Sequence, residues 1–198
     1  GEGGMALTNS YEIAKNLRLY RSHGITSEFE EKDSFPEDEI WNYQQIDLGC
    51  NFRMTDILAA LGLSQLSKLD RFVKRRNEIA NTYDRLLKDL PLTLPFVKDS
   101  CYSSYHLYPI RINKKKTGIN QKDFYKLLRE NLVKVNVHYI PVYRHPFYSS
   151  LGFKKNYCPQ AEAYYKETIS LPMFPALTHE NLKYIHTVIR DTLNKYVA

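Results

Sequence analysis

The apolar residues between Thr55 and Leu90 constrain the fold of this chain more than any other feature. They recur every three or four positions, which predicts an amphipathic helix with Thr55 as its capping residue. About 30 helical residues would extend roughly 45 Å at about 1.5 Å per residue. We therefore expect this helix to bend near Gly62 or Asp70, or to bridge two subdomains, and to mark a natural domain boundary.

A shorter amphipathic helix and a long loop are predicted before this segment. The short helix begins at Tyr11, with Asn9 or Ser10 as its cap, and the turn that contains Gly24 ends it. Residues 25–46 show no apolar periodicity and are rich in Asp and Glu, which predicts a long loop. Loops of this length in compact domains are usually functional or mobile.

The rest of the chain alternates between strands and helices. Strands are predicted at Tyr105–Ile112 and Val135–Ile140, with a helix at Asn120–Leu132 between them. Two more helices are predicted to begin at Pro159 and His179. This order indicates a small α/β layer.

Composition indicates a globular protein. Apolar residues make up 43% of the chain and charged residues 25%, and no run approaches the roughly 18 apolar residues of a membrane span. The formal net charge of +6 raises a nucleic-acid hypothesis, but Lys114–Lys116 form the only cationic cluster, which we interpret as the cap of a loop. We therefore expect neither a membrane nor a nucleic acid as partner.

Three cysteines are widely spaced, at positions 50, 101 and 158, and form no CxxC pair. We interpret them as free thiols of a cytoplasmic protein. The spacing of Cys, His, Asp and Glu predicts no metal site and no Ser-His-Asp set.

Two glycine-containing segments have both a structural and a functional interpretation. The segment "GEGG" at the start is interpreted as a tight turn rather than a phosphate loop, and it precedes "MALT", which predicts a short strand. The segment "GCNFR" is either a turn with a surface arginine or an anion site. In the second case, Asn51 would offer an amide donor and Arg53 a bidentate donor beside a helix N-terminus.

A third segment, "VHYIPVYRHP", brings aromatic and ionisable side chains to the end of a predicted strand. The group begins with His138 and Tyr139. It is either a functional site or a set of half-buried residues at the edge of a sheet. His106 alternates with apolar neighbours on its predicted strand, so we interpret it as a sheet residue.

Taken in order, these segments resemble the DegT/StrS family of pyridoxal-phosphate sugar aminotransferases. The matching blocks are "GEGGMALTN", "RSHGI", "GCNFRMTDILAALGLSQL", "YHLYPI", "VHYIPVY" and "ISLPMFPALTHENL". Within the family, the later blocks resemble enzymes that aminate C4 of a UDP-linked 4-keto-6-deoxy-HexNAc sugar for pseudaminic acid synthesis.

The resemblance implies an α/β fold, the C-terminal part of a fold-type-I aminotransferase. Residues 1–54 would end the large cofactor-binding domain and carry an active-site loop, residues 55–90 would form the long connecting helix, and residues 91–198 the small domain. The family is active as a homodimer and takes its amino group from glutamate. Its cofactor, pyridoxal 5′-phosphate, is held by a Schiff-base lysine.

Site residues are carried over by position within the matched blocks. Asn51 would bind the cofactor phosphate of the neighbouring subunit, and Arg53 would order the loop or meet an anion. His138 and Tyr139 would line the sugar-nucleotide pocket. A substrate-binding role is implied more weakly for His23 and His106, the latter beside its interpretation as a sheet residue.

The resemblance puts the catalytic lysine about five residues before Gly1, and Gly3 and Gly4 would turn the chain tightly behind it through positive φ angles. We therefore expect these 198 residues to be a C-terminal portion that is inactive alone. The alternative hypothesis is a silent remnant that acts as a dimerisation module or pairs with a complementary N-terminal half. Without the rest of the large domain, the apolar faces of "MALT" and of the Tyr11 helix should be exposed, which favours association.

Overall fold

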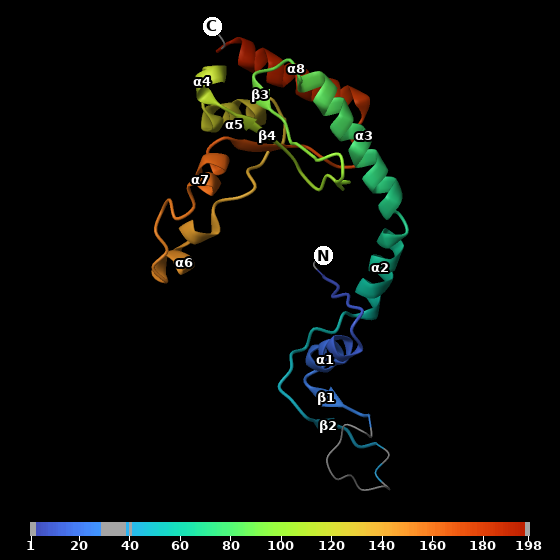
Figure 1. The fold of residues 1–198 in the computed structure, drawn as a ribbon. Helices are drawn as coiled ribbons and strands as arrows, with labels where there is room; N and C mark the ends of the chain where they lie inside the picture. Colours follow the sequence, from blue (N-terminus) through green and yellow to red (C-terminus); the bar gives the residue numbers. More distant parts are fainter. Residues whose placement is uncertain (1–2, 29–38, 40, 197–198) are drawn as a thin grey trace. The chain divides into compact units, whose positions relative to one another are not determined.

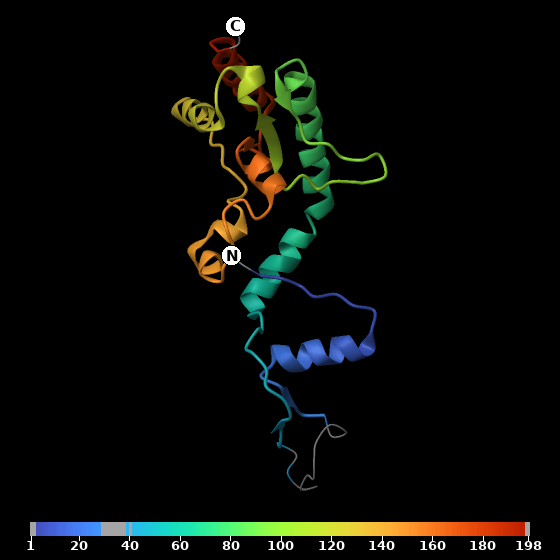
Figure 2. The same cartoon turned by 60° about the vertical axis from the view of Figure 1, so that its left-hand side comes forward.

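The computed structural model describes residues 3–28, 39 and 41–196. It divides into two compact units, Gly1–Ser67 and Lys68–Ala198. Figure 1 shows the elements of each unit, and Figure 2 shows the same elements after a rotation.

The first unit begins with a helix whose position agrees with its prediction. Helix α1 spans Tyr11–Arg21, and the Ser10 hydroxyl accepts a hydrogen bond from the Ile13 N–H at 3.4 Å. The predicted strand "MALT" is wrong, because these residues adopt no strand pairing in the described structure. A strand needs a neighbouring strand for its backbone groups, and the described residues of this unit provide none beside residues 5–8.

The segment predicted as a long loop contains a short antiparallel ladder. Strand β1 (Ile25–Thr26) pairs with β2 (Gln44–Gln45), with Ile25 opposite Gln45. Part of the predicted loop, residues 29–38 and 40, lies outside the described residues.

The predicted long helix is two helices. Helix α2 spans Asp56–Leu66 with Thr55 as its cap, as expected, and α3 spans Leu69–Leu87. The interruption at Ser67 and Lys68 coincides with the boundary between the two units.

The second unit is a three-stranded antiparallel sheet with helices packed around it. Strand β4 (Tyr108–Ile112) lies between β3 (Leu92–Thr93) and β5 (Thr168–Leu171). In the β4–β5 ladder, Ile110 lies opposite Ile169. Helix α3 lies beside α8 (His179–Asn194), which also contacts α5 (Gln121–Glu130) (Figures 1 and 2).

The remaining helices of this unit are short. They are α4 (Lys114–Thr117), the 3₁₀ helix η2 (Val142–Arg144), α6 (Pro146–Ser150) and α7 (Pro159–Tyr165). Helix α4 is made by the lysine cluster, which is therefore a capped helical turn rather than only the cap of a loop: the Asn113 side chain caps it and Gly118 ends it at a φ of 71°.

Two strand predictions in this unit are wrong in extent. The segment Val135–Ile140 forms a single bridge, between Asn136 and Ser170, because only Asn136 reaches the edge of β5 with both backbone groups. Strand β4 begins at Tyr108 rather than Tyr105, since a φ of 45° at Tyr105 is incompatible with an extended strand. The helices expected from Pro159 and His179 are confirmed.

The hydrophobic core belongs to the second unit. Its fully buried side chains include Tyr83, Tyr108, Phe124, Ile169 and Ile189. In the first unit, neither α1 nor α2 has a buried residue, which confirms the expected exposure of the apolar face of α1. None of the described helices has the length and apolar character that a bilayer crossing requires.

Candidate functional site

The loop that contains Asn51 is fastened to the end of α1 by backbone hydrogen bonds. The N–H of Cys50 donates to the carbonyl of Tyr20 at 2.8 Å, and the N–H of Phe52 donates to that of Arg21 at 3.0 Å. In return, the N–H of His23 donates to the Cys50 carbonyl at 3.0 Å. Asn51 therefore has a fixed backbone although its side chain is exposed.

A side-chain pair adds a second fastening to this loop. The Tyr20 hydroxyl donates to Oδ2 of Asp47 at 2.7 Å, and Oδ1 of Asp47 accepts from the N–H of Leu48 at 2.7 Å. The hydrogen bond from Tyr20 lowers the pKa of Asp47, and the same bond raises the pKa of Tyr20.

The side chains of Asn51 and Arg53 remain free for a ligand. Both are exposed, and within the described residues neither makes a side-chain hydrogen bond or ion pair. They lie shortly before the N-terminus of α2, whose first N–H groups carry partial positive charge. An amide, a guanidinium and a helix N-terminus form a donor set that suits an oxyanion such as a phosphate.

His23 takes part in the same loop mainly through its backbone. It has a φ of 64°, its N–H binds the Cys50 carbonyl, and its own carbonyl accepts from Nε2 of Gln45 at 3.0 Å. Its imidazole is exposed. The element "RSHGI" thus forms a turn that joins α1 to the loop.

The predicted glycine turn at the start of the chain is wrong in its mechanism at Gly4, which has no positive φ. The φ of Gly3 involves an atom of Glu2, which lies outside the described residues. Gly1 lies outside the described residues, so the structure says nothing about the rest of that turn.

In the second unit, His138 and Tyr139 lie beside the edge of β5. Nδ1 of His138 is 2.9 Å from the hydroxyl oxygen of Ser170, and the two rings of His138 and Tyr139 meet edge to face with centroids 4.6 Å apart. His138 is half-buried, whereas Tyr139 is 68% exposed. One ring is therefore held by the protein and the other is open to a ligand.

The residues that follow are held by Glu162 of α7, which the sequence did not single out. The Tyr143 hydroxyl donates to Oε1 of Glu162 at 3.1 Å, and Arg144 forms an ion pair with Oε2 at 3.7 Å. Arg144 also lies over the ring of Tyr165 at 5.1 Å from its centroid. Glu162 is 3% exposed, but no local pattern distinguishes a buried glutamate from the many at the surface.

His106 is not a sheet residue, which corrects its prediction. It precedes β4, its side chain is exposed, and its carbonyl accepts from the Arg76 guanidinium at 3.3 Å. The same guanidinium nitrogen binds the carbonyls of Tyr105 and Met173 at 2.9 and 3.0 Å. No contact within this unit joins His106 to His138 among the described residues.

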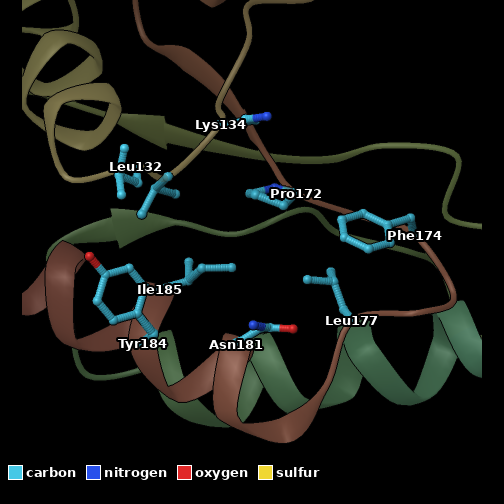
Figure 3. Close-up of a pocket in the computed structure, with 9 residues that line it drawn as sticks. Leu132, Lys134, Pro172, Phe174, Leu177, Asn181, Tyr184 and Ile185 are labelled. Atoms are coloured by element: carbon cyan, nitrogen blue, oxygen red, sulfur yellow. The ribbon is translucent and has the colours of Figure 1, made fainter.

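A pocket with a volume of about 220 Å³ lies elsewhere in this unit. Figure 3 shows the residues that line it. Its lining is mostly apolar, with Leu132, Phe174 and Leu177 on its walls and the polar side chains of Lys134 and Asn181 among the others. None of the residues predicted from the sequence as site residues lines it.

The cysteines agree with their sequence interpretation as free thiols. All three cysteines are free and exposed. In the part of the chain that the structure describes, no cluster of three or more His, Cys, Asp or Glu side chains could hold a metal ion.

Comparison with known proteins identifies the family of this chain. The model of the DegT/DnrJ/EryC1/StrS aminotransferase family matches residues 1–190. The chain belongs to this family. Aminotransferases of the DegT family depend on pyridoxal phosphate, and the free donors of Asn51 and Arg53 fit the phosphate of that cofactor.

Individual relatives support the same assignment. The chain is 38% identical over 197 residues to the UDP-4-amino-4,6-dideoxy-N-acetyl-beta-L-altrosamine transaminase of Helicobacter pylori, a match that covers 96% of this chain and 48% of the relative. It is also similar to the structure of Helicobacter pylori PseC, an aminotransferase involved in the biosynthesis of pseudaminic acid. That match has a TM-score of 0.81 and 34% identity, and covers 96% of this chain and 48% of the other.

A further structural relative is Spr1654 from Streptococcus pneumoniae in its PLP form. The TM-score is 0.80 at 26% identity, and the match covers 96% of this chain and 46% of that chain. The expected α/β fold of a fold-type-I aminotransferase portion is therefore confirmed. The chain spans about half the length of the relatives it matches.

Proposed function

We propose that this DegT-family chain contributes the phosphate-binding loop and the substrate-binding small domain to an enzyme that aminates a nucleotide-linked 4-keto-6-deoxy sugar. The observation that carries the proposal is the match of residues 1–190 to the family, together with the free donors of Asn51 and Arg53. The Helicobacter pylori relative, whose name describes a UDP-linked 4-amino-4,6-dideoxy sugar, supports the substrate class. Glutamate is the proposed amino donor.

Pyridoxal phosphate, when bound, supplies an electron sink for the transfer of the amino group. Asn51 donates an amide N–H to the cofactor phosphate of a neighbouring subunit in a homodimer. Arg53 neutralises its charge or orders the loop. His138 and Tyr139 line the pocket of the sugar nucleotide. His23 holds the Asn51 loop chiefly through its backbone. His23 and His106 have exposed imidazoles and are weaker candidates for substrate binding.

In this proposal the catalytic lysine lies outside these 198 residues, so the chain alone does not turn over substrate. The free cysteines support a cytoplasmic location, where thiols stay reduced. Mixing the chain with one that supplies the large domain should restore transamination. Association without turnover would instead favour the alternative of an inactive dimerisation module. The exposed apolar residues of α1 and α2 support this alternative, because they offer a surface for association.

The cofactor role of Asn51 and Arg53 is tested in the complete enzyme by titration with pyridoxal phosphate, followed by absorbance. We expect Asn51→Ala and Arg53→Met each to weaken cofactor binding about tenfold, because each removes a hydrogen bond to a charged oxygen. Arg190→Met removes another exposed arginine side chain, on α8, and serves as the control. Unchanged cofactor affinity in both loop variants would contradict the proposed phosphate site.

A further inference from the structure

We propose that Ser170 is a positioning residue that holds His138 in the tautomer with its proton on Nε2. The imidazole then offers an N–H donor to an oxygen of the bound nucleotide sugar. The identity of the ligand rests on the proposed function, whereas the tautomer rests on the contact between Ser170 and His138 alone.

The backbone brings these two side chains together. Ser170 lies in β5 opposite Pro109, which has no N–H to donate. On its other edge, the Ser170 N–H donates to the Asn136 carbonyl at 2.8 Å, and the Ser170 carbonyl accepts from the Asn136 N–H at 3.3 Å. His138 follows two residues later, and its Nδ1 reaches the Ser170 hydroxyl at 2.9 Å.

The burial of Ser170 decides which atom carries the proton. Ser170 is 4% exposed, and Nδ1 of His138 is the one partner of its hydroxyl among the described residues. If Nδ1 carried the proton and donated it, the serine hydrogen would be left buried without an acceptor, which is costly. If the serine donates instead, both groups are satisfied. Nδ1 is then the acceptor, and the proton of the neutral imidazole resides on Nε2.

This tautomer suits the proposed ligand. The phosphate and sugar oxygens of a nucleotide sugar are mainly acceptors, so an Nε2–H donor attracts them, whereas an unprotonated Nε2 would oppose their lone pairs. Nε2 has no partner among the described residues, and the edge-to-face ring of Tyr139 restricts rotation of the imidazole. Ser170 thus acts on the ligand through His138.

Nuclear magnetic resonance of the complete enzyme labelled with ¹⁵N-histidine tests the tautomer without any ligand. The His138 signals are identified by their loss in His138→Gln. We expect an unprotonated Nδ1 and a protonated Nε2 in the wild type, and a mixture of tautomers in Ser170→Ala. Ser170→Thr keeps a hydroxyl and should restore the single tautomer. A proton on Nδ1 in the wild type overturns the proposal, even if Ser170→Ala fails to fold.

Thr168→Val is the matched control for Ser170→Ala. Thr168 lies on the same strand, is fully buried, and its hydroxyl has no hydrogen-bond partner in the part of the chain that the structure describes. Removing that hydroxyl perturbs the strand to a similar degree without touching His138. We expect the tautomer of His138 to be unchanged in Thr168→Val, and a loss of the tautomer in this variant would contradict the specific role of Ser170.

Calorimetric titration with uridine diphosphate tests the consequence for binding. We expect Ser170→Ala to weaken binding about twofold to tenfold, because binding falls with the fraction of His138 that keeps its proton on Nε2, and Thr168→Val to leave it unchanged. In the background of His138→Gln, Ser170→Ala should have no further effect. Equal affinity of wild type and Ser170→Ala overturns the positioning role. A wild type that shows the expected tautomer but binds no uridine diphosphate contradicts the proposed function instead, and supports the assignment of the tautomer.

Discussion

Gly24 and Gly49 are packed so closely that neither position has space for a side chain. A Cβ atom at Gly49 would lie 2.3 Å from the backbone nitrogen of Gly24, and one at Gly24 would lie 1.9 Å from the carbonyl oxygen of Asp47. Gly24 also has a φ of 70°, which disfavours any other residue. This contact fixes the turn after α1 against the loop that contains Asn51.

Gly49→Ala should therefore displace that loop. We expect weaker binding of pyridoxal phosphate and a loss of about 1–3 kcal/mol in the free energy of unfolding, because backbone atoms must move to accept the methyl group. Gly62→Ala is the control, since Gly62 lies within α2 with open space around it, and alanine should favour the helix by about 1 kcal/mol. Cofactor titration and chemical denaturation of both variants check the prediction. Equal effects would refute the role of the glycine contact.

Arg144→Leu should destabilise the segment that follows His138. The substitution leaves the carboxylate of Glu162 buried without its cation, which costs about 3–5 kcal/mol in buried pairs. Lys126→Met breaks an exposed pair with Glu130 at the same distance of 3.7 Å and should cost less than about 1 kcal/mol. Urea denaturation measures both. A similar loss in the free energy of unfolding in Arg144→Leu and Lys126→Met would mean that burial of Glu162 does not determine how much its ion pair stabilises the protein.

Tyr20→Phe should raise the pKa of Asp47 toward its ordinary value, because the hydroxyl that stabilises the ionised carboxylate is removed. The pKa of Asp47 is lower in the folded than in the unfolded protein, so its contribution to stability is present above the unfolded value and is lost as pH falls through the folded value. A pH titration of the Asp47 carboxyl carbon by nuclear magnetic resonance measures the change. Tyr11→Phe, on the same helix, should leave it unaltered, and no shift in Tyr20→Phe would disprove the assignment.

Arg76→Met should loosen the segment before β4. One guanidinium nitrogen binds the carbonyls of Tyr105, His106 and Met173, and its removal leaves all three without this donor. We expect a loss of about 1–3 kcal/mol in stability and faster amide hydrogen exchange near residues 105–108. Lys74→Met changes an exposed cation of the same helix and should have little effect. Unaltered exchange in Arg76→Met would contradict this role.

Local signals in the sequence predicted the helix starts well. Ser10 and Thr55 each cap a helix through a side-chain oxygen, as their residue types and the periodicity behind them indicate. Asn120, predicted as the first residue of its helix, is instead the cap of α5. Strands were predicted less well. Residues 135–140 carry a strand pattern, but a strand forms only where a partner edge is available, and here the pairing stops at Asn136.

The family, the cofactor and the α/β class were determined by the sequence itself, because they follow from blocks of residues in a fixed order. Candidate site residues could also be identified from the sequence, because their amide, guanidinium and imidazole groups occur together in short segments. Only the tertiary structure showed which other side chains bind and position these residues. Glu162 and Ser170 are an ordinary glutamate and serine in the sequence. They become supports of Arg144 and His138 because folding buries them, and a buried polar group requires the partner that lies beside it.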